Sequence, residues 1–263
     1  MADLEALLRD FSDECTDLER LVATLAPADW SKPTPAPGWT IAHQIGHLAW
    51  TDEVATLATA DPDGFAELLE DAAPKAFTFV DEAAEEAATA PTAELIERWR
   101  RGRAGLIEAL RAVTPGAKVV WFGPPMSAAS MVSARIMESF AHGQDIADAL
   151  GVTRTPTARL RTVAHIGART RNFAYTVRGK SAPAEEFLVE LTAPDGGLWT
   201  WGPQDAAQRV TGPALDFCLL VTQRRHRDDL ALETVGADAA EWLTIAQAFA
   251  GPTGEGRTAG QFE

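Results

Sequence analysis

The sequence predicts an α+β protein, with an up-down four-helix bundle at residues 1–153 followed by a smaller α+β domain at residues 154–263. Two patterns lead to this prediction. In the first half, apolar residues recur at helical spacing along four long segments. In the second half, helical segments alternate with short strand-like runs bounded by turn residues. At 263 residues the chain can bury the core of one large domain or of two modest ones.

The composition limits the classes of partner and the cellular compartment. A formal net charge of −15 disfavours nucleic acid and anionic membrane surfaces, because both attract basic patches. Only two cysteines occur, Cys15 and Cys218, so no disulfide framework is possible and a reducing compartment is indicated. The N-terminus is acidic and amphipathic rather than a signal peptide, and no apolar run approaches the ~20 residues of a membrane span. We therefore expect a cytoplasmic protein without nucleic-acid or membrane partners.

The first half is expected to contain four long helices joined by connectors of different character. A proline-rich connector follows the first helix, and an apolar, proline-broken connector precedes the fourth, where it forms either a wall beside a pocket or a packed loop. An Ala- and Glu-rich segment, 65–90, is also expected to be helical and mostly solvent-facing. The long helices are expected at residues 3–26, 40–60, 92–113 (capped by Thr92) and from Ser127 or Ser130 to Gly151.

The second half reads as helix, hairpin, helix, short strand and helix. Two strand-like runs flank the turn sequence PDGG at 194–197, which is typical of a β-hairpin. The triplet Thr211-Gly212-Pro213 is expected to start a helix, because proline is favoured at the first helical position. The expected elements are helix 157–178, strands 187–192 and 198–201, a helix from 211, strand 230–234 and helix 239–249.

The fourth helix carries a possible metal-binding pair. Glu138 and His142 are four residues apart and share one helix face, with Asp145 on the same face. A carboxylate and an imidazole at this spacing can hold a divalent metal, and a further acidic group can orient the ligating ring. An ordinary amphipathic helix with a solvated acidic face has the same spacing. A metal site therefore requires a third ligand from another segment.

Two histidines in the second helix are candidates for that ligand. His43 and His47 lie in a segment that is apolar on both sides, which indicates a buried helix. Burial of an imidazole costs free energy unless the ring finds a partner. Each ring is therefore either a hydrogen-bonded core residue or a ligand of a metal shared with the fourth helix.

Two segments together resemble a known family. GWTIAHQIGHLAW, at 38–50, and ESFAHGQDIADALG, at 138–151, are similar to the DinB-like metal-binding bundle of the mycothiol-dependent maleylpyruvate isomerase family. In that family a histidine of the first segment and the Glu-x-x-x-His of the second hold zinc. The resemblance assigns zinc, or another divalent metal, to His47, Glu138 and His142.

The resemblance also suggests roles for nearby residues. His43 lies outside the family's core pattern and is expected to be structural or to lie beside the ligands. Asp145 matches the pattern, and we expect it to hold a ligand or Arg135 without binding the metal. The second half resembles the family's C-terminal domain, in which an arginine after the LLVTQRR helix lies near the active site. Arg224 is the best match, with Arg225 close behind. Arg224 is expected to anchor a substrate carboxylate, although a solvated basic helix end would look the same.

The implied function is a metal-dependent reaction of a low-molecular-weight thiol. Two histidines and one carboxylate leave an open position on zinc, and an open zinc can bind a thiol as its thiolate. No cysteine lies near the motif, so the resemblance implies mycothiol as the thiol cosubstrate. The expected enzyme is an isomerase or a thiol S-transferase that acts on an electrophilic small molecule. Two alternatives remain open: a non-catalytic metal- or ligand-binding protein, and a metal-dependent hydrolase with His43, Asp52 or Asp145 as general base.

Overall fold

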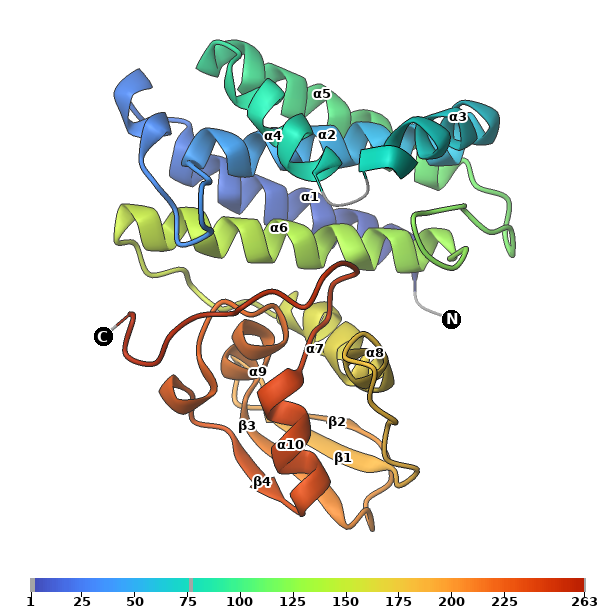
Figure 1. Ribbon diagram of the computed structural model, residues 1–263, viewed down its shortest axis with the longest axis vertical. Helices are drawn as coiled ribbons and strands as arrows, with labels where there is room; N and C mark the ends of the chain where they lie inside the picture. Colours follow the sequence, from blue (N-terminus) through green and yellow to red (C-terminus); the bar gives the residue numbers. More distant parts are fainter. Residues whose placement is uncertain (1–2, 76–77, 263) are drawn as a thin grey trace. The chain divides into compact units, whose positions relative to one another are not determined.

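The computed structural model describes residues 3–75 and 78–262 of the protein. The chain divides into two compact units, Met1–Thr153 and Arg154–Glu263 (Figure 1). The first unit is helical and the second contains a four-stranded sheet with flanking helices, which confirms the predicted fold class. None of the described helices combines the length and the apolar character that a membrane span requires.

Four long helices form the frame of the first unit. They are α1 (Leu4–Val22), α2 (Ile41–Ala60), α5 (Thr92–Arg111) and α6 (Ala128–Leu150). Helix α2 packs against both α5 and α6, and α1 packs along α6 (Figure 1). Buried side chains lie on all sides of α2, as the sequence predicts. The helix that carries Glu138 and His142 therefore lies against the helix that carries His47.

The ends of α6 follow from local chemistry. The Ser127 side chain accepts a hydrogen bond from the Ser130 backbone N–H, which satisfies one of the free donors at the helix start. At the other end, Gly151 adopts a left-handed conformation with φ 65°, which glycine tolerates and which ends the helix. Both ends agree with the sequence prediction.

The expected single helix at 65–90 is wrong. The structure has α3 (Pro62–Ala72), a short 3₁₀ turn (Ala73–Lys75) and α4 (Phe79–Ala88). Pro74 explains the break, because it lacks an N–H and cannot donate the next hydrogen bond of the helix. Helix α4 is also less exposed than predicted. It packs on α2 at Gly46, where an added Cβ would lie 2.7 Å from the Ala87 Cβ.

Other helix ends in the first unit differ from the predictions by a few residues. Helix α1 ends at Val22, four residues earlier than expected, and a 3₁₀ turn at Pro27–Ser31 follows it. Thr92 does not cap α5 but is its first residue, because Pro91 occupies the capping position.

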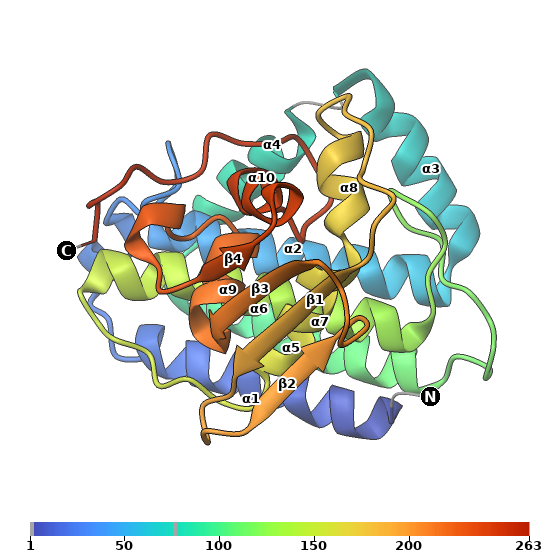
Figure 2. The ribbon, with the colours of Figure 1, turned by 90° about the horizontal axis from the view of Figure 1, so that it is seen from below.

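The sheet of the second unit has the strand order β2-β1-β3-β4. Its strands are β1 (Phe187–Thr192), β2 (Leu198–Trp201), β3 (Gln208–Pro213) and β4 (Glu233–Val235). Strands β1 and β2 pair antiparallel, with Val189 opposite Trp201, so the predicted hairpin is confirmed. Figure 2 shows the four strands side by side, and helices α7 (Leu160–Arg169) and α9 (Ala214–Val221) pack against them.

The predicted helix start at Thr211-Gly212-Pro213 is wrong, because these residues complete β3. This strand pairs parallel with β1, with Gly212 opposite Leu191. At Gly212 the φ is 143°, and an added Cβ would lie 2.5 Å from the carbonyl oxygen of Ala231. The glycine is therefore needed for close strand packing, and α9 begins only at Ala214.

The expected helix at 157–178 is divided into α7 and α8 (Arg171–Thr176). At the break, the Thr170 hydroxyl donates to the carbonyl of Gln247, 3.0 Å away, in a distant segment. The last helix, α10 (Ala237–Ile245), is shorter than the expected 239–249, and β4 lies slightly later than the expected 230–234.

Candidate metal centre

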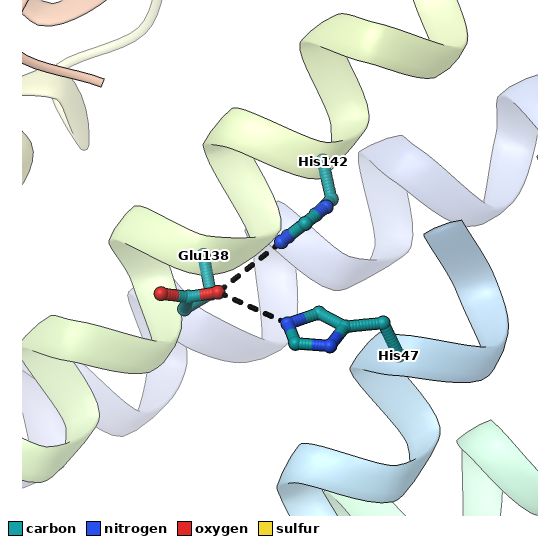
Figure 3. Close-up of side chains that lie close together, drawn as sticks. All are labelled: His47, Glu138 and His142. Carbon is teal, nitrogen blue, oxygen red and sulfur yellow. Dashed lines mark hydrogen bonds and ion pairs between the residues drawn. The ribbon is translucent and has the colours of Figure 1, made fainter. Parts of the chain in front are cut away.

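Three side chains from α2 and α6 converge in the first unit (Figure 3). His47, Glu138 and His142 each offer a ligand atom, and these atoms all lie within 4.8 Å of one another. His47 Nε2 is 3.4 Å and His142 Nε2 is 3.2 Å from the same carboxylate oxygen, Glu138 Oε2. These are the three residues that the sequence resemblance selects as metal ligands. The rest of the site is built around them.

Gln44, one turn before His47, holds the ring of His142. Its Oε1 accepts a hydrogen bond from His142 Nδ1, while its Nε2 donates to Thr34 Oγ1, 2.9 Å away. The Thr34 hydroxyl in turn donates to the carbonyl of Trp39. This chain fixes which end of the Gln44 amide faces the histidine, because the amide nitrogen already has an acceptor. His142 therefore carries its proton on Nδ1 and directs the lone pair of Nε2 toward Glu138.

The contact with Gln44 leads to the first prediction. In Gln44→Leu the His142 ring loses the acceptor that fixes its tautomer and orientation. We expect metal affinity to fall by roughly 10- to 100-fold, as is usual when a group that orients a ligating histidine is removed. Competition with a coloured chelator measures the change.

Gln144→Leu is the matched control for that experiment. Gln144 lies on the same helix as the ligands, but its amide donates to Asp148 rather than to a ligand ring. Its substitution is expected to leave metal affinity unchanged. Equal affinities of wild type and Gln44→Leu would show that packing alone orients His142.

Trp39 packs against both histidine rings. Its ring is stacked on His142 at 5.9 Å between centroids with an interplanar angle of 17°, and lies 5.3 Å from the His47 ring. Its Nε1 donates to Asp81 Oδ1 on α4, 2.9 Å away. Trp39 thus places an apolar surface beside the two imidazoles. It also links the connector before α2 to α4.

Burial and neighbouring charges set the protonation of the ligands. Burial lowers the pKa of His47 to about 4, and the nearby His142 adds to this, so His47 is neutral at pH 7. Burial opposes ionisation of Glu138, but its close contacts with the two histidines and the charge of Arg135 lower its pKa well below the ordinary value. A neutral imidazole and an ionised carboxylate are the forms that bind metals.

The geometry is also suited to a metal. The lone pair of His142 Nε2 faces an anionic oxygen, an arrangement that is unfavourable unless a cation or a proton lies between the two atoms. Ligand atoms about 2.0–2.1 Å from a tetrahedral zinc are about 3.3 Å from one another. The two nitrogen–oxygen separations, 3.4 and 3.2 Å, are close to that value.

The other residues singled out from the sequence lie in different settings. His43 is outside the cluster: its Nδ1 accepts from the Thr40 N–H and its Nε2 contacts Glu85 Oε2 at 2.7 Å. Asp145 is fully buried on α6. Its expected role in holding a ligand stays a prediction, whereas Arg135 makes no hydrogen bond to Asp145 among the described residues.

Arg224 belongs to the second unit. Helix α9 ends at Val221, and Gln223 adopts a left-handed backbone with φ 57°, so Arg224 follows the helix rather than extending it. Its Nη1 donates to the carbonyl of Thr222. The role of Arg224 in anchoring a substrate stays a prediction.

The protein thus combines a helical bundle and an α+β domain, and the bundle contains a histidine–carboxylate cluster. These features define a bundle protein with a candidate metal centre. Residues 11–147, which include all three candidate ligands, match the family described as mycothiol maleylpyruvate isomerase N-terminal domain. The chain belongs to this family. Residues 183–234 match a second family, described as wyosine base formation.

Similar proteins extend over almost the whole chain. Two uncharacterized proteins of Mycobacterium tuberculosis, from strains CDC 1551 / Oshkosh and H37Rv, are each 59% identical over 257 residues, covering 98% of this chain and 100% of the relative. The crystal structure of a mycothiol-dependent maleylpyruvate isomerase has a similar fold, with a TM-score of 0.57 at 19% identity. The crystal structure of a mutant of that enzyme has a TM-score of 0.61 at 18% identity. Both comparisons cover 88% of this chain and 93% of the other chain.

Proposed function

We propose that the protein is a zinc-dependent enzyme that uses mycothiol as a low-molecular-weight thiol on an electrophilic small molecule. Its reaction is a maleylpyruvate-type isomerisation or a thiol S-transfer. The observation that carries this proposal is the convergence of His47, Glu138 and His142, with His47 neutral and Glu138 ionised as metal binding requires. Membership of a family named for a mycothiol enzyme supports the choice of thiol.

The three ligands would leave one position open to a further group. A divalent metal held there supplies a positive charge that lowers the pKa of a bound thiol, so that the thiol is present as thiolate at neutral pH. The protein contributes rings that are already oriented: Gln44 holds His142, and Trp39 packs against both imidazoles. Neither His47 nor Glu138 needs to lose a proton at pH 7 before it binds the metal.

The protein's own cysteines are unsuited to the role of the thiol. Cys15 of α1 is fully buried, with its Sγ 3.6 Å from Ser139 Oγ of α6, and burial raises the pKa of its thiol far above the ordinary value. Cys218 is also fully buried, with its thiol directed at the carbonyl of Leu160. A buried neutral thiol is a poor nucleophile. This supports an external thiol as cosubstrate.

An assay with separate additions of zinc and thiol tests the proposal. Metal-free protein is reloaded with zinc and given maleylpyruvate or a simple carboxylated electrophile, with and without mycothiol. Turnover is expected only when both are present. Zinc-dependent turnover without any thiol would contradict the proposal and favour the hydrolase reading. A protein that binds zinc but converts no electrophile with mycothiol would favour a non-catalytic binding protein.

Arg224 provides a further prediction. If its guanidinium anchors a substrate carboxylate, Arg224→Ala should lose one charge-assisted contact, which contributes about 1.5–3 kcal/mol. If the contact is also made in the transition state, its loss lowers kcat/KM by about 10- to 100-fold, while zinc content and folding stay intact. Steady-state kinetics with a carboxylated electrophile and mycothiol measures the change.

Arg225→Ala is the matched control for that measurement. Arg225 lies at the same end of α9, and its guanidinium covers the ring of Phe262, 3.9 Å from the ring centroid. Its loss is expected to leave turnover unchanged. If Arg224→Ala is as active as wild type, Arg224 is not the anchor.

A further inference from the structure

Arg135 is a buried arginine that makes no hydrogen bond within the described part of the chain. It lies on α6 one turn before Glu138, and only 4% of its surface is exposed. Its Nε and Nη1 are both buried without a hydrogen-bond partner among the described residues. The nearest ion pair is with Glu138, where Nη2 and Oε1 are 4.0 Å apart, too far for a hydrogen bond.

A guanidinium in this state is unusual because burying a charge without partners costs free energy. Arg103 of the same unit shows the ordinary solution. Its side chain is 16% exposed, it donates to the carboxylate of Glu19, and it covers the ring of Trp99. Arg135 has an aromatic neighbour as well, Trp121, with 5.7 Å between guanidinium and ring centroid, but it has no bonded carboxylate. Arg135 therefore lacks the carboxylate partner that Arg103 has.

Asp52 is not the carboxylate partner of Arg135. It is buried on α2 near enough for its pKa to respond to the charge of Arg135, yet no ion pair of 4.0 Å or less joins the two side chains among the described residues. Asp52 therefore leaves the hydrogen-bonding capacity of Arg135 unused.

Two sets of contacts connect Arg135 with the candidate metal ligands. On α6, Glu138 directs Oε2 at the two histidines and Oε1 toward Arg135. The second set is a series of ring contacts that runs from the candidate ligand His47 to Trp121, whose ring lies beside Arg135. Its members are His47, Trp50, Phe79, Phe122 and Trp121, with neighbouring ring centroids 5.0 to 6.1 Å apart.

We propose that Arg135 binds a carboxylate group of the small molecule that reacts at the metal centre. The proposal rests on the proposed function, since it takes the metal centre as the reacting site. A carboxylate fits because its two oxygens match the paired N–H groups of a guanidinium, and the flanking indole of Trp121 favours a flat group. Arg135 would thus select for carboxylated electrophiles and fix one end of them close to Glu138.

A competing role for Arg135 is to steer Glu138 alone. In that case its substitution would alter metal affinity without altering the binding of any carboxylate. The two roles are separated by measuring zinc content and carboxylate binding on the same samples.

Calorimetric titration with maleate, a small planar dicarboxylate, provides the test. Its dimethyl ester, which has the same carbon skeleton without the charge, is the matched ligand. Zinc-loaded wild type should bind maleate and bind the ester at least tenfold more weakly. Arg135→Met should weaken maleate binding by about 10- to 100-fold with zinc content unchanged, and Arg135→Lys should lie between the two, because lysine keeps the charge but not the planar fork.

The control variant is Arg111→Met, in which an exposed arginine paired with Glu5 and Glu108 is removed. It should bind maleate as wild type does. Circular dichroism of each variant checks the fold, and Arg135→Lys carries the test if Arg135→Met does not fold. The inference would be overturned if wild type and both Arg135 variants bound maleate with equal affinity. It would also be overturned if the variants lost zinc but kept the wild-type affinity for maleate. A wild type that binds neither ligand would overturn it as well.

Failure of this inference and failure of the proposed function can be distinguished. Maleate binding that depends on Arg135 in metal-free protein would support the carboxylate site even if no thiol-dependent turnover were found. Turnover with mycothiol that is unaffected by Arg135→Met, together with unchanged maleate binding, would leave the enzyme intact and refute the site.

Discussion

A His142→Ala variant is expected to retain less than about one hundredth of the wild-type affinity for zinc. Loss of a group that only orients a ligand costs about 10- to 100-fold, so loss of a direct ligand should cost more. The remaining pair, His47 and Glu138, comes from two different helices and would leave two coordination positions to solvent. Elemental analysis after gel filtration, with a chelator titration for the affinity, measures the change.

His43→Ala is the matched control for this experiment. His43 lies one turn before His47 on α2 but is bonded to Thr40 and Glu85. It should bind zinc as wild type does. If His142→Ala holds stoichiometric zinc with wild-type affinity, the cluster is not the metal site. If both variants lose zinc equally, the effect comes from damage to the bundle.

The second large effect is expected at Asp52. Burial raises the pKa of this carboxyl in the folded protein to about 7, and the charges of Arg135 and Arg103 offset only part of the rise. In the unfolded chain the pKa is near 3.8. Between these two values the folded state holds a proton that the unfolded state has lost. The free energy of unfolding therefore falls as pH rises through this window and becomes level above pH 7. Asp52→Asn removes this dependence.

Relative to wild type, Asp52→Asn should gain about 2 kcal/mol of stability between pH 5.5 and pH 8, at 1.36 kcal/mol per pH unit up to pH 7. Urea unfolding of both metal-free proteins at the two pH values measures the gain. The low pKa of His47 acts in the opposite direction, but it acts equally in both proteins and cancels in the comparison. Asp63→Asn, at an exposed position on α3, is the control. A constant difference between wild type and Asp52→Asn would show that Asp52 is ionised throughout.

Local signals in the sequence were sufficient for several elements. Ser127 and Gly151 mark the ends of α6, and the PDGG turn marks the β1–β2 hairpin, because capping and turn chemistry act over a few residues. The family resemblance selected the three residues that the structure brings together. Their binding of a metal is a prediction.

Long-range features were beyond the reach of the same reasoning. Gly212 and Pro213 resemble a helix start locally, but they belong to strand β3, which pairs parallel with the distant strand β1. Gln44 was missed because an amide in a buried helix carries no signal of the residue it will bind, and His142 is 98 residues away. In the sequence, Arg135 stands out only as a group that Asp145 is expected to hold. Its burial without a hydrogen bond depends on packing that a helical wheel does not contain.

The ring contacts between His47 and Trp121 have a consequence for how this protein could change over evolution. The candidate ligands all come from α2 and α6, whereas Phe79 begins α4 and Trp121 with Phe122 lies in the loop before α6. Substitutions in α4 or in that loop would alter the shape and polarity beside the metal ligands without touching them. Because loops tolerate change better than packed helices, new substrates could be acquired through these residues while the metal chemistry is inherited intact.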